Sequence, residues 1–221
     1  MDEERMVTFL SSLRRETSTF LSNLEQEAKA GDVPIIRKEM QDLLRFLVVS
    51  QKPDSILEVG TATGFSALLM WEASGKQVHI DTIEKYEKRI PIAHDNFTKD
   101  GATDYINLIE GDAEAVLDRL IEKQEANGRS GSYPFIFMDA AKAQYPVFLP
   151  KVTKLLRKGG LLISDNILQE GDVIESRYAV TRRNRTIHAR MREYLYDLKN
   201  NGDYETVILN IGDGVSLSYK L

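Results

Sequence analysis

The feature that most constrains the fold is an alternation of short apolar runs with helix-length segments between residues 55 and 164. The apolar runs are Ser55–Val59, Val78–Ile83, Ile106–Ile109, Phe135–Met138 and Leu161–Ser164. The segments between them are Ser66–Ala73, Tyr86–Asp100, Ala113–Glu125 and Pro146–Arg157. Strands alternating with helices are typical of βαβ units, in which helices cover both faces of a parallel sheet. The alternation therefore predicts a doubly wound α/β fold.

The two ends of the chain depart from this alternation. Apolar residues recur at helical spacing through residues 1–50, which predicts a helical N-terminal extension. Near the C-terminus, Thr206–Ile211 and Val215–Tyr219 flank Gly212-Asp213-Gly214, a pattern typical of an antiparallel hairpin. No repeat or linker divides the sequence, so we expect residues 1–221 to form a single domain.

Composition excludes several classes of site. The chain has 221 residues, a formal net charge of −5 and no cysteine, which excludes thiol nucleophiles, zinc–cysteine centres and disulfide frameworks. No apolar stretch approaches the roughly 18 residues that a membrane span requires. The start, Met-Asp-Glu-Glu, has neither the basic residues nor the apolar core of a signal peptide. We therefore expect a cytoplasmic protein that does not enter a membrane.

The first three predicted strands end in residues that suit an adenosine ligand. The first leads into Glu58–Ser66, a turn whose Gly60 and Gly64 allow a ligand to approach the backbone. These glycines do not form the Gly-x-Gly-x-x-Gly fingerprint of a pyrophosphate site. Glu84 ends the second strand, where it can accept ribose hydroxyls, and Gly111-Asp112-Ala113 ends the third, where Asp112 can face an adenine amino group.

Each of these features also has a purely structural interpretation, as a glycine turn, a solvated acid or a helix cap. Taken together and in this order, they favour an adenosine site without a pyrophosphate cradle. That combination suits S-adenosylmethionine, whose sulfonium and ammonium groups favour acids over bases.

The fourth and fifth predicted strands end in oxygen ligands. Asp139 follows the fourth, and Asp165-Asn166 follows the fifth. If these strands are neighbours, their ends lie about 5 Å apart. Three oxygen donors without histidine or cysteine favour a hard cation such as Mg²⁺. The alternative is structural, with Asp139 capping a helix and Asp165-Asn166 forming a turn.

Lys142 lies three residues beyond Asp139, beside the predicted cation. A nearby dication and partial burial both lower the pKa of a lysine, which makes a neutral amine available as a general base. A cation with open positions can also hold two neighbouring oxygens of a substrate and lower the pKa of one hydroxyl. The predicted reaction is O-methylation at a pair of vicinal oxygens.

These motifs together resemble the cation-dependent O-methyltransferases, which include the catechol and caffeoyl-CoA O-methyltransferases. The resemblance covers nearly the whole chain. It implies a Rossmann-like class I methyltransferase fold with a seven-stranded, mostly parallel sheet whose last strand is antiparallel. It also implies that Lys142 is the catalytic base and that Asp139, Asp165 and Asn166 bind Mg²⁺. The implied S-adenosylmethionine contacts are Ile36, Glu58, Gly60, Ser66, Glu84, Gly111, Asp112, Ala113 and Asp139.

Within this family the chain most resembles the bacterial tRNA 5-hydroxyuridine methyltransferases, which make 5-methoxyuridine at the wobble position. The signs are Val33-Pro34-Ile35, Gln144-Tyr145 after the Asp139–Lys142 motif, Ile167-Leu168 after Asp165-Asn166, and Gly212-Asp213-Gly214. The two oxygens O4 and O5 of 5-hydroxyuracil are vicinal, as in a catechol. The resemblance therefore implies the tRNA anticodon loop as substrate, with a small-molecule catechol-type O-methyltransferase as the alternative.

An arginine-rich segment supports an RNA substrate. Six arginines and no acidic residue lie between residues 177 and 192. Arginines beside an active site can contact phosphates and stack on bases, and we expect this of Arg177, Arg182, Arg183 and Arg185. The alternatives for these arginines are a solvated helix face that pairs with acids elsewhere and a contact within a homodimer, the assembly that the resemblance implies. For the whole chain, a non-catalytic nucleotide- or RNA-binding module is a further alternative.

Overall fold

The computed structural model describes residues 3–31 and 33–221. The described residues form one seven-stranded sheet in the order β3-β2-β1-β4-β5-β7-β6. Strands β1 to β5 pair in parallel, whereas β7 is antiparallel to both β5 and β6. The strands are β1 (Ser55–Val59), β2 (His79–Glu84), β3 (Ile106–Glu110), β4 (Tyr133–Met138), β5 (Leu156–Ser164), β6 (Tyr204–Leu209) and β7 (Val215–Lys220). The predicted fold class is confirmed.

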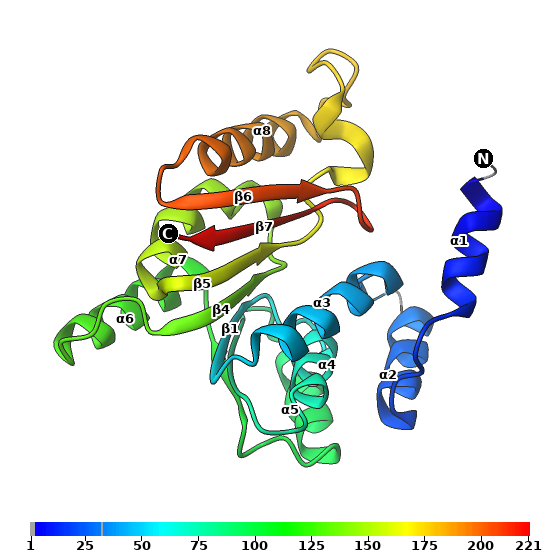
Figure 1. Ribbon diagram of the computed structural model, residues 1–221, viewed down its shortest axis with the longest axis vertical. Helices are drawn as coiled ribbons and strands as arrows, with labels where there is room; N and C mark the ends of the chain where they lie inside the picture. Colours follow the sequence, from blue (N-terminus) through cyan, green and yellow to red (C-terminus); the bar gives the residue numbers. More distant parts are fainter. Residues whose placement is uncertain (1–2, 32) are drawn as a thin grey trace.

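Helices cover both faces of this sheet, and an N-terminal extension precedes it (Figure 1). The α-helices are α1 (Glu3–Ser12), α2 (Thr19–Ala30), α3 (Lys38–Gln51), α4 (Phe65–Ala73), α5 (Ile90–Lys99), α6 (Ala113–Ala126), α7 (Tyr145–Leu155) and α8 (Arg185–Asn200). Two 3-10 helices, η1 (Lys142–Gln144) and η2 (Gln169–Ile174), follow the ends of β4 and β5. No helix in the described part of the chain is long and apolar enough to cross a membrane.

Alternate residues of the strands build two separate cores. On one face, Ile56 of β1 packs in a cluster with buried side chains of α2 to α5, including Trp71. On the other face, Leu57 packs with buried side chains of α6 to α8, including Tyr194. Both faces of the strands are covered, as a parallel sheet requires, so ligands have access to the sheet at the ends of its strands.

Several element boundaries differ from the sequence prediction. Strand β5 begins at Leu156 rather than Leu161, because Leu156 already pairs with Tyr133 of β4. Helix α5 begins at Ile90 rather than Tyr86, with Pro91 in its first turn, where a missing N–H costs nothing. Strand β6 covers Tyr204–Leu209 rather than Thr206–Ile211, so the hairpin turn is longer than predicted.

Helix α8 was missed by the sequence prediction, which identified only an arginine-rich segment there. Its buried side chains are His188, Met191, Tyr194 and Leu198, at helical spacing. Exposed charges between them mask the apolar pattern in the sequence.

The N-terminal extension is helical, as predicted. Helices α2 and α3 contact α4, whereas α1 stands apart from the sheet (Figure 1). Large apolar side chains of α1 and the turn after it remain exposed, namely Met6, Phe9, Leu10 and Leu13.

Candidate active site

The carboxyl ends of β1 to β5 form a row at one edge of the sheet. The residue after each strand continues the ladder: Gly111 donates to Glu84, Asp139 to Val59 and Asp165 to Met138, at backbone N–O distances of 2.9–3.0 Å. A cavity of about 840 Å³ opens along this row. Of the predicted site residues, the cavity is lined by Ile36, Gly60, Ser66, Glu84, Gly111, Asp112, Ala113, Asp139, Lys142 and Asn166.

The glycines after β1 are required by packing as well as by any ligand. Gly60 has φ +108°, and a Cβ there would lie 2.2 Å from the carbonyl oxygen of Asp139. Gly64 has φ +87° at the start of α4, and its Cβ would lie 2.5 Å from the Phe97 ring. A side chain at either position would therefore displace the neighbouring strand end or helix.

Glu58 lies behind this turn rather than on the cavity wall. Its side chain is fully buried and accepts hydrogen bonds from Ser66 Oγ, at 2.5 Å, and from Thr82 Oγ1. Burial raises the pKa of Glu58 to about 7. Because Ser66 does line the cavity, the geometry makes Glu58 a support for the wall and places Ser66 where a ligand can reach it.

Glu84 is held in the cavity wall by backbone donors. Its carboxylate accepts from the N–H groups of Ala62, Lys85 and Tyr86 at 2.8–2.9 Å. A carboxylate has about four acceptor positions, so Glu84 keeps capacity for a hydroxyl group of a ligand. These contacts fix its orientation before any ligand binds.

Asp112 both caps a helix and lines the cavity. Its side chain accepts from the Glu114 N–H at 3.0 Å, which caps α6, and pairs with Lys85 at 3.2 Å. The hydrogen bond from Lys85 keeps the pKa of Asp112 below its usual value. With Gly111 and Ala113 it also lines the cavity, so a capping role does not remove it from the site.

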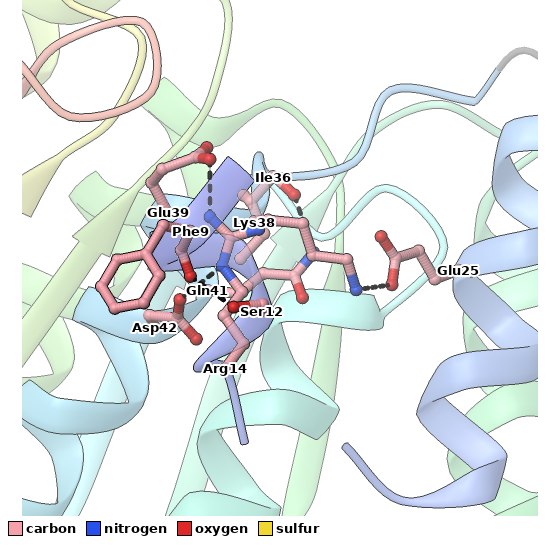
Figure 2. A network of polar contacts seen from close by, with 9 residues as sticks. All are labelled: Phe9, Ser12, Arg14, Glu25, Ile36, Lys38, Glu39, Gln41 and Asp42. Carbon is pink, nitrogen blue, oxygen red and sulfur yellow. Dashed lines mark hydrogen bonds and ion pairs between the residues drawn. The ribbon is translucent and has the colours of Figure 1, made fainter. Parts of the chain in front are cut away.

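The segment before α3 closes one side of the cavity. Ile36 is buried and lines the cavity, and Gln41 Nε2 donates to its carbonyl oxygen at 3.0 Å (Figure 2). Nearby, Arg14 pairs with Glu39 at 2.6 Å and with Asp42 at 2.8 Å, which ties the chain between α1 and α2 to α3 (Figure 2). The N-terminal extension therefore supports the position of Ile36.

The predicted cation ligands meet at the ends of β4 and β5. Asn166 Nδ2 lies 3.0 Å from Asp139 Oδ1, and the Asn166 N–H donates to Asp165 Oδ1 at 2.7 Å. The Tyr145 hydroxyl lies within hydrogen-bond distance of two carbonyl oxygens, those of Met138 (3.1 Å) and Asp165 (3.0 Å). Asp139 and Asn166 line the cavity, whereas Asp165 is buried just beneath its wall.

The pKa values of both carboxyl groups are raised above their usual range. Burial raises the pKa of Asp139. Burial and then the neighbouring Asp139 raise the pKa of Asp165 to about 7. Two crowded carboxylates and an amide oxygen are a donor set that fits a hard dication, whose charge would relieve this repulsion.

Lys142 begins η1, three residues after Asp139, and its side chain is half-buried in the cavity wall. It is close enough to Asp139 and Asp165 to stabilise both carboxylates electrostatically. The structure thus brings the predicted base and the predicted cation ligands into one half of the cavity.

The arginine-rich segment reaches the cavity at Asn184. Asn184 lines the cavity, and Arg182, Arg183 and Arg185 flank it in the sequence. Arg177, Arg182 and Arg183 are exposed and form no salt bridge with another described residue. Arg185 is half-buried, with Nε donating to the Val180 carbonyl at 3.3 Å.

Among the cavity residues to which the sequence prediction gave no site role are Gln169 and Asp213. Asp213 is buried in the hairpin turn, and its carboxylate accepts from the Glu170 N–H at 2.6 Å. Its position between two glycines was the available signal, but the sequence could not show that this turn meets the loop after β5.

Comparison with known proteins agrees with this geometry. Residues 9–221 match the model of a family described as O-methyltransferase. The chain belongs to the O-methyltransferase family. The prediction of an O-methyltransferase is therefore confirmed, whereas the narrower tRNA branch stays a prediction.

Individual relatives support the same family. Caffeoyl-CoA O-methyltransferase 1 of Eucalyptus globulus is 32% identical over 173 residues, which are 75% of this chain and 66% of the relative. A putative caffeoyl-CoA O-methyltransferase of Staphylococcus aureus has a similar structure, with a TM-score of 0.84 and 29% identity over 99% of this chain and 98% of its own. An O-methyltransferase of Bacillus cereus, solved in complex with SAH, shares the fold, with a TM-score of 0.82 and 23% identity over 97% and 96% of the chains.

Proposed function

We propose that this O-methyltransferase transfers the methyl group of S-adenosylmethionine, with the help of Mg²⁺, to the 5-hydroxyl of 5-hydroxyuridine at the wobble position of tRNA. The observation that carries the proposal is one cavity with two chemically distinct halves. The ends of β1 to β3 supply Ser66, Glu84 and Asp112, and the ends of β4 and β5 supply the oxygen ligands and Lys142.

The first half suits the methyl donor. Glu84 can accept a ribose hydroxyl, Asp112 lies where an adenine amino group can reach it, and Ile36 covers the ligand from the side of α3. The Bacillus cereus relative binds SAH, the product left when S-adenosylmethionine loses its methyl group. When bound, S-adenosylmethionine supplies an electrophilic methyl group on a sulfonium.

The second half suits the acceptor. Asp139, Asp165 and Asn166 would hold Mg²⁺, which would supply charge to orient two vicinal oxygens and favour the ionised hydroxyl. Lys142 Nζ takes the proton of the substrate 5-hydroxyl as that oxygen forms its bond to the methyl carbon. The carbon–sulfur bond breaks at the same time and leaves a neutral thioether, so no further acid is required.

The exposed arginines beside the cavity favour RNA over a free catechol. Arg177, Arg182 and Arg183 are exposed, and the last two lie within two residues of Asn184, which lines the cavity of a chain whose formal net charge is −5. Arginines without acidic partners are available for phosphates and for stacking on loop bases. The anticodon loop presents both to an enzyme that acts on its wobble base.

The proposal is tested by methyl transfer from labelled S-adenosylmethionine to an anticodon stem-loop that carries 5-hydroxyuridine, with Mg²⁺ and with a chelator. A free catechol serves as the parallel substrate. We expect label in 5-methoxyuridine only when Mg²⁺ is present. Label on the catechol alone would contradict the tRNA substrate and support the small-molecule alternative, whereas no transfer to either would contradict the methyltransferase mechanism.

We also propose that the chain forms a homodimer through α1. Phe9, Leu10 and Leu13 expose 54–65% of their surfaces on and just after a helix that stands apart from the sheet. A Leu13→Asp change is expected to convert a dimer of about 50 kDa, twice the 25.1 kDa chain, to a monomer. Light scattering coupled to size-exclusion chromatography measures this, and an unchanged mass would exclude α1 as the contact.

A further inference from the structure

The loop after β5 is held rigidly against the hairpin turn. The Ile167 N–H donates to the Gly214 carbonyl at 3.1 Å, and the Leu168 N–H donates to the Asp213 carbonyl at 2.9 Å. The Glu170 N–H donates to Asp213 Oδ1 at 2.6 Å. Three amides of a four-residue stretch are therefore fixed on one turn, which orders the loop before a substrate arrives.

The loop backbone has an uncommon conformation that these contacts maintain. Asn166, Gln169 and Glu170 have φ values of 57°, 50° and 54°, in the left-handed region that most residues avoid. Gly214 has to be glycine, because a Cβ there would lie 2.3 Å from Leu168 Cγ. The backbone on both sides of Gln169 is therefore fixed, which restricts the directions that its side chain can take.

Gln169 lines the cavity, and its side chain has an unused acceptor that a turn of the amide would present to a ligand. Its Oε1 is buried and has no hydrogen-bond partner among the described residues. A buried amide oxygen without a donor is costly, so at a cavity wall it points to a donor that the ligand brings. Two neighbouring polar groups have partners within the protein, since Asp213 accepts from Glu170 and Asn184 donates to Asp172 at 2.8 Å.

We propose that Gln169 Oε1 accepts a hydrogen bond from the N3–H of the uracil ring and so selects 5-hydroxyuracil over a catechol. This inference rests on the proposed function. Along the edge of 5-hydroxyuracil, O5, O4 and N3–H follow one another. With O5 and O4 turned toward Asp139 and Asn166, the N3–H is the next group along the ring.

Gln169 lies three residues beyond Asn166 on the same ordered loop, and it is the next residue in the sequence that lines the cavity. A catechol carries a C–H where uracil carries N3–H, and it would leave Oε1 unpaired. A site built to pair with a substrate N–H discriminates against an analogue that lacks it, because the buried acceptor is then left without a donor.

The test compares two anticodon stem-loops, one with 5-hydroxyuridine and one with the 3-deaza analogue, in which C–H replaces N3–H and O4 is a hydroxyl, as in a catechol. We expect the unchanged chain to prefer 5-hydroxyuridine by about tenfold in kcat/KM, the effect of one hydrogen bond in a buried site. This comparison requires no variant, so it does not depend on the folding of one. Equal kcat/KM for the two RNAs would overturn the assignment.

The Gln169→Met variant keeps the length of the side chain and removes the acceptor. We expect it to lose about tenfold on 5-hydroxyuridine, chiefly through KM, and to treat both RNAs alike. The matched control is Gln26→Met, at an exposed position of α2, which should keep the preference. A preference that survives in Gln169→Met would assign the discrimination to another group and overturn the proposal.

The outcomes separate this inference from the proposed function. Transfer to 5-hydroxyuridine without a preference for N3–H would leave the function standing and overturn the role of Gln169. Transfer to catechol but to neither RNA would contradict the proposed tRNA substrate, and the role of Gln169 would fall with it.

Discussion

Two buried carboxyl groups serve opposite halves of the cavity, and both have a pKa raised to about 7. Glu58, behind the half that suits the methyl donor, is buried but receives hydrogen bonds from Ser66 and Thr82. Asp165, beneath the other half, is buried next to a second carboxylate, Asp139. Both lie near other carboxylates, but Glu58 receives two hydroxyl hydrogen bonds, whereas Asp165 receives one backbone hydrogen bond, from Asn166.

This difference indicates what each half requires. The wall formed by β1 to β3 is complete without a charged ligand, because the acids there have backbone, hydroxyl or lysine donors. The ends of β4 and β5 hold two neighbouring carboxylates, so they gain from a bound cation. A raised pKa alone would not distinguish these cases, but the neighbours of each carboxyl group do.

The largest effect is expected from Asp165→Ala. It removes one of the proposed Mg²⁺ ligands, and we expect kcat/KM for methyl transfer to fall by about a hundredfold or more. Glu58→Gln is the matched change on the other half and is expected to keep most of the activity. Steady-state rates at saturating Mg²⁺ measure both, with calorimetric SAH affinity as the check on folding. Equal losses of kcat/KM in the two variants would contradict the difference between the two halves of the cavity.

Lys142→Met removes the proposed base but no cation ligand. We expect kcat to fall by about a hundredfold with little change in SAH affinity, because general-base catalysis contributes on this scale. Lys123→Met, at an exposed position of α6, is the matched control. An unchanged kcat in the Lys142 variant would remove its catalytic role.

A smaller effect is expected from the exposed arginines near the cavity. Arg182→Ala with Arg183→Ala should weaken tRNA binding by about tenfold at moderate salt, since two phosphate contacts are lost, and leave SAH affinity unchanged. Lys123→Ala with Arg129→Ala removes the same charge at the far end of α6 and should have little effect. Filter binding at two salt concentrations measures the difference. Equal tRNA affinity in the two double variants would contradict the RNA interpretation.

A separate prediction concerns stability and its dependence on pH. A carboxyl whose pKa is higher in the folded than in the unfolded state binds more protons when folded, so stability falls as pH rises from about 4 to 7. Glu58 and Asp165 should each contribute a loss on the order of 3 kcal/mol across this window. Denaturant unfolding of the metal-free protein measures the slope.

The two halves of the cavity predict different changes of this pH dependence. Glu58→Gln should reduce that slope whether or not Mg²⁺ is present, because Gln cannot titrate. Excess Mg²⁺ should remove the part of the slope that comes from Asp139 and Asp165. If Mg²⁺ left the pH dependence of stability unchanged in the Glu58→Gln variant, the cation would not bind at Asp139 and Asp165.

The sequence predicted the strand ends well, because strand order and burial follow from the spacing of apolar runs. Gly60, Glu84, Asp112 and Asp139 meet in one cavity for this reason. The sequence could not show that Glu58 would lie behind the cavity wall. Both faces of a buried parallel strand are covered by apolar side chains, so the pattern does not tell which face a residue occupies. Nor could it place Gln169, whose position depends on a contact with the hairpin 44 residues later.

The most direct test of the difference between the halves is calorimetric titration of Mg²⁺ into the SAH-bound protein. We predict one binding site in the unchanged chain, the same site in Glu58→Gln, and its loss in Asp165→Ala. Undiminished Mg²⁺ binding by Asp165→Ala, or its loss in Glu58→Gln, would contradict the assignment of the cation to the ends of β4 and β5.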